Sequence, residues 1–465
     1  MELRAYPDRL SNLAVDALGT YVSDLLVQLV TFPQYTERQN AKQLYVQHTC
    51  ARLHDFLWSA LPVSSANETT VKLLRCLHHT YSAISVTPYK SSCEEIAPEL
   101  LAAILHPAVM RLECTDLTSH PTVIDYYKID CCDLIYKSLP KLKRLKTLNL
   151  GWSNKFGMQD LKIDNAQNLE QFSYRHCNIS HIKSLSKSCR SLKSLVITAS
   201  GWITDEIVSS LLKFQQLENL VLENECVTQT YLTKILCGLS QSQEGSNRSL
   251  LLKSFGCRNP TDVHIDLLVE RFRNVSSISL SNVQDCSLTP LKGLKHLKKF
   301  TLKYSRFFVV DNLLRAIGQQ IECLDFTDIY AIDLGAVGES CPFLLCFHLR
   351  CFEKPAALPL PDKCSFTEYS DRYSLPEFSS ERNLELALND DCLTEYIMSR
   401  FTYVRKLYLS SRGSEAFLQT VLKRKHLKYL EQFFWGDHTI VTFTEQRAVI
   451  RKFEGRRISM CSLET

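Results

Sequence analysis

The sequence lacks any hydrophobic run long enough to cross a bilayer, because its apolar stretches fall well short of the roughly 18 residues that a membrane helix needs. It also lacks a recognisable secretion signal. Charged residues interrupt the first segment at Glu2, Arg4 and Asp8, and no small-residue cleavage site follows an apolar run. We therefore expect an intracellular protein, cytoplasmic or nuclear or both, with no membrane partner.

An excess of charge of one sign is also missing. The chain has 54 Lys and Arg residues against 50 Asp and Glu, and a net charge of +4 does not argue for a polyanionic partner. Basic residues do gather where three predicted strands begin, and they could line one edge of a sheet: Lys141, Lys143, Arg144 and Lys146; Lys292, Lys295, Lys298 and Lys299; Lys423, Arg424, Lys425 and Lys428. Because no aromatic residues interleave at stacking spacing, the pattern favours a solvated edge over nucleic-acid binding.

Catalytic signatures are absent as well. There is no Gly-x-x-x-x-Gly-Lys-Ser/Thr phosphate loop, no Gly-x-Ser-x-Gly elbow and no His-Glu-x-x-His zinc helix. The nearest approaches to metal ligands are Asp130-Cys131-Cys132-Asp133 and Cys346-Phe347-His348, and neither has a second pair at a plausible spacing. The 19 cysteines are odd in number and scattered, unlike a disulfide scaffold. We predict no enzymatic activity, no catalytic residue, no metal and no cofactor.

One short phrase recurs instead: an apolar residue, two variable ones, an apolar residue, one variable residue and a third apolar residue. It reads Leu145-Leu148-Leu150, Leu169-Phe172-Tyr174, Leu192-Leu195-Ile197, Leu217-Leu220-Leu222, Val275-Ile278-Leu280, Leu297-Phe300-Leu302, Ile321-Leu324-Phe326 and Leu344-Phe347-Leu349. Successive middle residues between Leu148 and Leu220 are about 23 to 25 positions apart, which is the period of leucine-rich repeats.

Each strand phrase is followed by a stretch with helical spacing, such as Thr204 to Leu212, in which Thr204 can cap the helix. The alternation predicts an α/β leucine-rich-repeat solenoid, a curved parallel sheet with outer helices, preceded by a small helical N-terminal domain. We place the helical domain at residues 1–92, the repeat array at 93–437, and a C-terminal cap or tail at 438–465.

The repeat pattern has two interruptions. Residues 239–250 form a polar insertion that predicts a surface loop, and Phe255 then marks a degenerate strand. Between Phe352 and Glu381 the signal blurs, so that this stretch is either shortened repeats or a loop across the array. The phrase resumes at Val404-Leu407-Leu409 and Leu427-Leu430-Phe433.

The segment from Ser188 to Ile197, continued by Ile203-Thr204-Asp205-Glu206, resembles the cysteine-containing leucine-rich repeat, in which Cys-x-x-Leu-x-x-Leu-x-Leu precedes an Ile-Thr-Asp turn. Cys341 to Leu349 is similar. This repeat type is common in F-box proteins, which recruit substrates to a cullin-type ubiquitin ligase. The resemblance implies a protein-binding receptor that works with an adaptor.

A second resemblance lies near the N-terminus. Leu10, Ala14 and Leu18 have the spacing of an elongin-binding box, Leu-x-x-x-Cys-x-x-x-aliphatic, with Ala14 in place of the cysteine. This arrangement is similar to the N-terminus of the Zyg-eleven family, elongin-binding leucine-rich-repeat receptors. The same spacing arises in any amphipathic packing helix, which is the other interpretation of these residues.

The partner-binding residues of a leucine-rich repeat are expected at the variable strand positions, which face the concave side of the sheet, and just after them at its rim. In this chain they are Trp152, Arg175, His176, Glu223, Lys303, Tyr304, Asp325, Asp328, His348 and Arg350. The mixture of aromatic, charged and imidazole side chains is typical of a protein-binding surface.

Two functions follow. In the first, the chain is the substrate-recognition subunit of a cullin-type E3 ubiquitin ligase, which binds its protein target on the concave face and an elongin or Skp-type adaptor through residues 1–90. In the second, it is a non-enzymatic leucine-rich-repeat scaffold or regulator with no ubiquitin role, and its N-terminal helices only cap the repeats.

Overall fold

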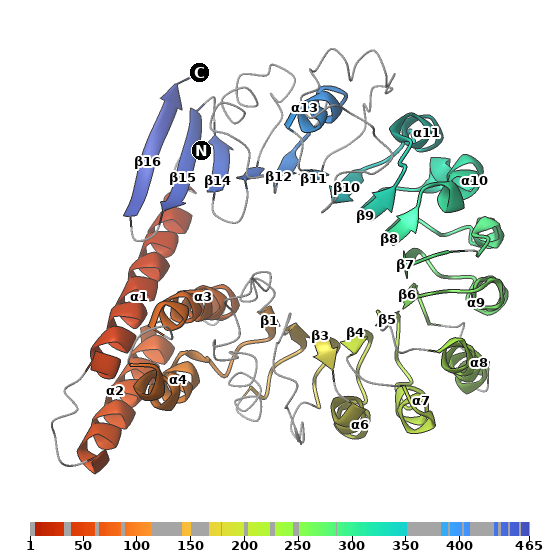
Figure 1. Cartoon of the computed structure of the whole chain (residues 1–465). Coiled ribbons are helices and arrows are strands. Elements are labelled where there is room, and N and C mark those ends of the chain that lie inside the picture. The colour runs from red at the N-terminus through yellow and green to blue at the C-terminus, as the bar shows by residue number, and fades with distance from the viewer. Residues whose placement is uncertain are drawn as a thin grey trace. The chain divides into compact units, whose positions relative to one another are not determined.

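The computed structural model describes residues 5–31, 39–60, 65–84, 89–113, 142–149, 167–177, 179–199, 203–223, 228–244, 251–284, 286–350, 383–388, 391–401, 404–409, 432–435, 439–444, 447–454 and 457–464. The chain forms two compact units, Met1–Cys226 and Val227–Thr465. Their helices and strands are labelled in Figure 1. We describe each unit by itself.

The first unit opens with four helices that pack on one another: α1 (Ala5–Thr31), α2 (Gln39–Ala60), α3 (Ala66–Ile84) and α4 (Lys90–Ile104). Helical apolar spacing explains the packing, because one stripe of each helix is removed from water. In α1 the buried stripe is Val22, Leu25, Leu26, Leu29 and Val30. Within the described residues no helix is long and apolar enough to span a membrane.

Gly19 lets α1 approach α3 closely. A Cβ atom built at Gly19 would lie 2.6 Å from the Sγ atom of Cys76, closer than real Cβ contacts allow. A side chain at position 19 would therefore require either a new rotamer of Cys76 or a larger separation of α1 and α3, which explains why a glycine stands within this helix.

In the described part of the first unit the sheet has parallel strands in chain order: β1 (Arg111–Glu113), β2 (Thr147–Asn149), β3 (Gln171–Cys177), β4 (Ser194–Ala199) and β5 (Asn219–Leu222). The middle residues of the repeat phrase face one another across these strands and are buried: Leu112, Leu148, Phe172, Leu195 and Leu220. This register confirms the predicted repeat.

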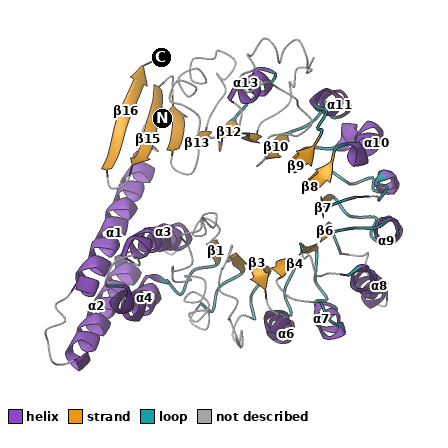
Figure 2. Ribbon diagram, viewed as in Figure 1, coloured by secondary structure: helices purple, strands orange, loops and turns teal. Residues whose placement is uncertain are grey.

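Helices α6 (Ile179–Ser188) and α7 (Asp205–Leu211) lie on one side of these strands (Figure 2). Ile207 and Leu211 are buried, as the helical spacing predicts. The expected cap is wrong in one respect, because Thr204 occupies the N-cap position with an extended backbone but its side chain makes no capping hydrogen bond.

The second unit begins with α8 (Gln229–Glu244) and continues the same design. Its parallel strands follow one another in chain order: β6 (Ser254–Arg258), β7 (Ser277–Ser281), β8 (Lys299–Arg306), β9 (Cys323–Tyr330), β10 (Cys346–Arg350), β11 (Asn383–Ala387), β12 (Lys406–Leu409) and β13 (Gln432–Trp435). The curved sheet has helices on its outer side: α9 (Asp262–Arg271), α10 (Phe308–Ile317), α11 (Leu334–Ser340) and α13 (Asp391–Ser399) (Figure 2). The fold is the predicted α/β leucine-rich-repeat solenoid.

The start of α9 is joined to α8 by the buried side chain of His264. The Thr261 backbone N–H donates to His264 Nδ1 at 3.0 Å, and His264 Nε2 lies 2.9 Å from the Gln229 carbonyl oxygen. Both contacts are satisfied by a neutral imidazole that accepts at Nδ1 and donates at Nε2. Burial keeps the pKa of His264 low, which favours that neutral form.

Two details of the expected repeat are corrected. Strand β11 stands between β10 and β12, so the array includes a repeat just after the stretch where the phrase blurs. In the last repeat Phe433 pairs with Leu407, whereas the expected phrase put Leu430 at that position. The true phrase there ends in Phe433 and Trp435.

After β13 the sheet continues with antiparallel strands β14 (Thr439–Thr444), β15 (Arg447–Glu454) and β16 (Arg457–Glu464). The change from parallel to antiparallel pairing allows short turns in place of helical crossovers. The domain limits at 92/93 and 437/438, and the capping role of the tail, stay predictions.

Candidate protein-binding face

Strand alternation gives the second unit a polar concave face, by which we mean the side of its sheet opposite the helices. In β9 and β10 the helix-facing residues are apolar and buried, and polar residues stand between them. Asp325, His348 and Glu385 lie side by side in register on β9, β10 and β11. Their side chains are 13%, 25% and 27% exposed, so the row is partly shielded but still open to a partner.

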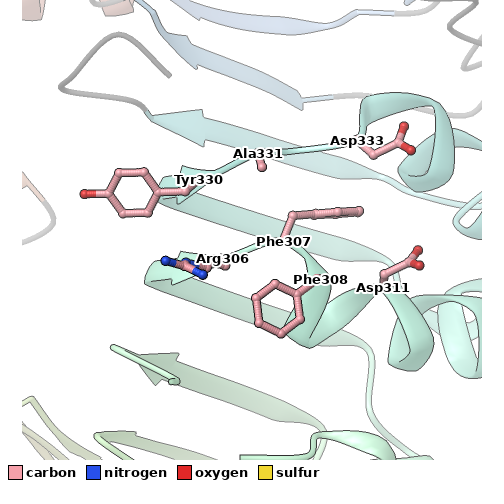
Figure 3. Close-up of a pocket in the computed structure, with 7 residues that line it drawn as sticks. All are labelled: Arg306, Phe307, Phe308, Asp311, Tyr330, Ala331 and Asp333. Carbon is pink, nitrogen blue, oxygen red and sulfur yellow. The ribbon is translucent and has the colours of Figure 1, made fainter. Parts of the chain in front are cut away.

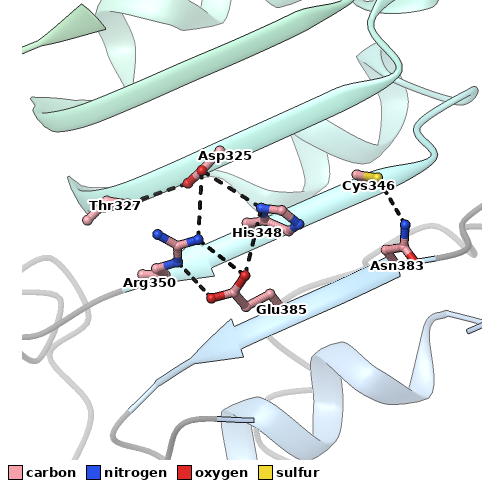
Figure 4. Close-up of polar contacts among 7 residues, drawn as sticks. All are labelled: Asp325, Thr327, Cys346, His348, Arg350, Asn383 and Glu385. Atoms are coloured by element: carbon pink, nitrogen blue, oxygen red, sulfur yellow. Dashed lines mark hydrogen bonds and ion pairs between the residues drawn. The ribbon is translucent and has the colours of Figure 1, made fainter. Parts of the chain in front are cut away.

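Arg350 connects the members of this row (Figure 4). Its Nε atom donates to Glu385 Oε1 at 2.8 Å and its Nη2 atom to Oε2 at 3.2 Å, a bidentate pair. The same Nη2 atom lies 3.9 Å from Asp325 Oδ2. The guanidinium is therefore held in a fixed orientation by carboxylates from two other strands.

The imidazole of His348 lies between the same two carboxylates. Its Nδ1 atom is 3.8 Å from Asp325 Oδ2 and 3.9 Å from Glu385 Oε2. We call Asp325, His348, Arg350 and Glu385 the charged cluster. With the imidazole neutral, two carboxylates face one guanidinium and the cluster is negative; with the imidazole protonated it is neutral.

Burial and ion pairing shift the pKa values of Asp325 and Arg350 in opposite directions. Burial alone would raise the pKa of Asp325, but the imidazole of His348 and the charge of Arg350 outweigh burial and leave that pKa below its usual value. Burial alone would lower the pKa of Arg350, and the hydrogen bonds to Glu385 outweigh it. Asp325 and Arg350 are therefore both charged at neutral pH.

Two thiols lie beside the charged cluster on the same face. Cys323 and Cys346 are register neighbours on β9 and β10, and the side-chain amide of Asn383 donates to Cys346 Sγ at 3.4 Å (Figure 4). Hydrogen bonds from the Cys323 thiol and from Asn383 lower the pKa of Cys346 to about 5, and the pKa of Cys323 is correspondingly raised. Nowhere in the described part of the chain do three or more His, Cys, Asp or Glu side chains form a group that could hold a metal ion.

Four successive repeats of the second unit have one residue with left-handed backbone, within or just after the strand. Asn259, Asn282, Tyr304 and Asp328 occupy equivalent positions of successive repeats, with φ between 50° and 53°. Asparagine and aspartate tolerate this conformation, whereas tyrosine rarely adopts it. Tyr304 is nevertheless 47% exposed, and the guanidinium of Arg258 lies 6.0 Å from its ring centre. Strand β8 therefore presents an aromatic ring at the position where the neighbouring repeats present short polar side chains.

A pocket of about 390 Å³ opens at the carboxyl ends of β8 and β9 (Figure 3). It is lined by Arg306, Phe307, Phe308, Asp311, Tyr330, Ala331 and Asp333. We call it the edge pocket. Arg306 and Tyr330 are register neighbours at the strand ends, and Ala331 bends the chain away with φ of 56°. The strain of a left-handed alanine is a feature often found at binding sites.

The two carboxylates that line the edge pocket, Asp311 and Asp333, already have hydrogen-bond partners. Asp311 accepts two hydrogen bonds of 3.1 Å from Arg315, and Asp333 caps α11 by accepting from the Ala336 backbone N–H at 3.0 Å. In Figure 3 both carboxylates point away from Arg306. The exposed Arg306 and the aromatic rings of Phe308 and Tyr330 are therefore the lining groups that face an incoming ligand, and the rings are 63% and 45% exposed.

The predicted partner-binding residues of the second unit fall in two groups. Asp325, His348 and Arg350 belong to the charged cluster, and Lys303, half-buried on β8, contributes to the potential at Asp325. Tyr304 and Asp328 are the left-handed residues of β8 and β9. The structure thus brings the first group together and places the second two residues before the ends of these strands.

The remaining predicted residues are dispersed over the first unit. Glu223 follows β5 and is half-buried, and Arg175 and His176 lie on β3 with side chains outside the described residues. Trp152 lies outside the described residues altogether. On α1, Ala14 is exposed and Leu18 half-buried, whereas the side chain of Leu10 is not among those described. Their binding roles stay predictions.

Several residues of the site were missed from the sequence. Glu385 could have been found, because Leu384 and Leu386 precede Leu407 and Leu409 by 23 positions each, the ordinary repeat spacing. The edge pocket had no such signal. Its residues, Arg306, Phe308, Tyr330 and their neighbours, lie beyond the repeat phrase, where β8 and β9 run four residues past the last apolar residue of the phrase.

No protein-family model matches the sequence, and no curated protein is detectably similar to it. Among solved structures, the chain is similar to internalin C2 of Listeria monocytogenes, with 16% identity, a TM-score of 0.24, and coverage of 42% of this chain and 78% of that one. It is also similar to a leucine-rich-repeat protein of Leptospira interrogans, with 13% identity, a TM-score of 0.26, and coverage of 71% and 91%. Likenesses at this level carry no argument about function, and the fold assignment rests on the strand register of the chain itself.

Proposed function

We propose that the chain is a non-enzymatic protein-binding leucine-rich-repeat protein whose target contacts the concave face of β8 to β11. The charged cluster is the observation that carries this proposal. Three strands contribute charged side chains that hold one another in position while a part of each stays exposed. A preorganised polar surface of this kind loses little conformational entropy when a partner binds.

The edge pocket supplies the kind of anchor that such a surface needs. Arginine and tyrosine dominate the binding energy of protein interfaces, and aromatic side chains are enriched there. Arg306, Phe308 and Tyr330 present these side chains around one cavity, next to the concave face. A target segment with a carboxylate beside an aromatic or aliphatic residue would complement both the guanidinium and the rings.

Site-specific photo-crosslinking tests where the target binds. A photoreactive amino acid replaces Tyr330 in the edge pocket or, as the control, Phe343, which is 59% exposed in the turn between α11 and β10. Position 330 should crosslink to a protein that position 343 does not reach. Equal crosslinking of one protein from both positions, or from position 343 alone, would contradict binding at this face.

We further propose that the chain acts as the substrate-recognition subunit of a cullin-type E3 ubiquitin ligase, with an elongin or Skp-type adaptor on α1. The spacing of Leu10, Ala14 and Leu18 and the exposure of Ala14 support this role. Among the described side chains of α1, the buried stripe runs from Val22 to Val30, whereas Ala14 is exposed. The alternative is a scaffold or regulator with no ubiquitin role.

Affinity capture followed by mass spectrometry separates these two possibilities. The native chain should recover an elongin or Skp-type adaptor together with a cullin, and Leu10→Asp should lose both. Val27→Asp is the matched control, since Val27 is 36% exposed on the same helix. Recovery of other partners with no cullin component would favour the scaffold.

A further inference from the structure

The two thiols of the concave face have the geometry of a reactive pair. Cys323 and Cys346 stand directly opposite each other on neighbouring parallel strands, whose spacing is roughly 4.7–4.9 Å. That spacing falls within the Cα separation that disulfides tolerate, about 4.4 to 6.8 Å. Both residues are half-buried, whereas Cys189, Cys257 and Cys341 are buried in the core.

The groups around Cys346 stabilise a thiolate at that sulfur. Asn383 on β11 donates a hydrogen bond to it, and Lys299 on β8 and His348 on β10 also favour its thiolate form. The carboxylate of Asp325 acts on Cys323 and opposes its ionisation. These neighbours lower the pKa of Cys346 and raise that of Cys323, so Cys346 is the more readily ionised thiol of the pair.

We propose that Cys346 is a peroxide-reactive nucleophile and Cys323 its resolving thiol, so that one equivalent of hydrogen peroxide closes a disulfide between β9 and β10. In the first step the Cys346 sulfur attacks one peroxide oxygen, the O–O bond breaks, and hydroxide leaves and takes up a proton to form water. In the second step the Cys323 sulfur gives up its proton and attacks the sulfenic acid sulfur, the S–O bond breaks, and a second water leaves. The two thiols lose two electrons and the peroxide gains them.

This disulfide would form at the centre of the proposed binding face. It removes the negative charge of the Cys346 thiolate, two residues from His348, and ties together two strands that carry the charged cluster. Oxidation should therefore change the affinity for the target. That consequence rests on the proposed function, whereas the thiol chemistry does not.

The test uses the purified, reduced full-length chain and two reagents. Iodoacetamide labelling, mapped by mass spectrometry, should modify Cys346 at least tenfold faster than Cys189, whose pKa burial raises to about 12. Between pH 6 and pH 8 the labelling rate of Cys346 should rise less steeply than that of an ordinary thiol, which gains roughly tenfold per pH unit in thiolate. One equivalent of hydrogen peroxide should then yield a Cys323–Cys346 peptide lighter by two hydrogens.

Two variants complete the design. In Cys323→Ser, peroxide should leave a sulfenic acid on Cys346 that dimedone traps, and in Cys346→Ser neither product should form. Labelling of Cys346 no faster than Cys189, or its oxidation in the native chain without a bond to Cys323, would overturn the proposal. These outcomes need no binding partner, so a failure of the proposed function cannot be mistaken for a failure of the thiol pair.

Discussion

The two faces of β9 and β10 share one backbone but have opposite chemistry. The side chains that face the helices, Leu324, Phe326, Phe347 and Leu349, are uniformly apolar and buried. Those between them, Asp325 and His348, are polar and partly exposed. The apolar rows stabilise the fold and repeat from strand to strand, whereas the polar rows vary because nothing in the fold requires a particular residue there.

The largest expected effect lies on the helix-facing side. Phe326 is fully buried, with ring centres 6.2 Å from Phe307 and 6.4 Å from Phe347. Phe326→Ala should lower the free energy of unfolding by about 3 to 5 kcal/mol, because it removes the buried ring and leaves a cavity. Urea denaturation measures the change. Phe343→Ala, in an exposed turn, should cost about 0.5 kcal/mol or less. Similar costs for both variants would contradict the division between the faces.

The second largest effect is a loss of folding stability of the first unit at low pH. Burial lowers the pKa of His181, on α6, to about 4. The unfolded chain, with a histidine pKa near 6.5, binds the proton first, so stability is full above about pH 6.5 and falls as the pH drops toward 4, by about 3 kcal/mol. Urea unfolding at several pH values measures the slope, and His181→Gln should flatten it. An unchanged slope in the variant would show that His181 is not the titrating group.

The third largest loss of stability is expected for a substitution of Gly318, at the end of α10. A Cβ atom at Gly318 would lie 2.3 Å from the Ser340 carbonyl oxygen and 2.9 Å from Cys341 Sγ. Gly318→Ala should therefore destabilise the second unit by about 1 to 3 kcal/mol, despite the higher helix propensity of alanine. Thermal unfolding of the two proteins compares them. A more stable variant would mean that α11 can move away from α10 without cost.

The smallest effect on stability is expected at the charged cluster. The side chains of Arg350 and Glu385 are 34% and 27% exposed, so water screens their pairing. A double-mutant cycle with Arg350→Ala and Glu385→Ala should give a coupling of about 0.5 to 1 kcal/mol. Urea denaturation of the four proteins supplies the values. A coupling as large as the cost of Phe326→Ala would mean that the cluster stabilises the fold and is not reserved for binding.

The sequence predicts the apolar rows well, because a period of about 24 residues places Leu148 and Phe172, or Phe300 and Leu324, on adjacent strands wherever they lie in the chain. It predicts the polar rows only in part. Glu385 was missed because residues 351–382 interrupt the period, so that no spacing connects it to Arg350. The edge pocket depends on the left-handed turn at Ala331, which no apolar pattern encodes.

We propose that a protein target binds at the concave face and edge pocket of the second unit. Calorimetry of the crosslinked target with Arg306→Glu and with Arg273→Glu tests this proposal. The two variants change charge equally, but Arg306 lines the edge pocket and Arg273 is exposed beyond the end of α9. We predict that Arg306→Glu weakens binding at least tenfold, about 1.4 kcal/mol, and that Arg273→Glu changes it less than about twofold. Equal losses in both variants, or a loss only in Arg273→Glu, would contradict the claim.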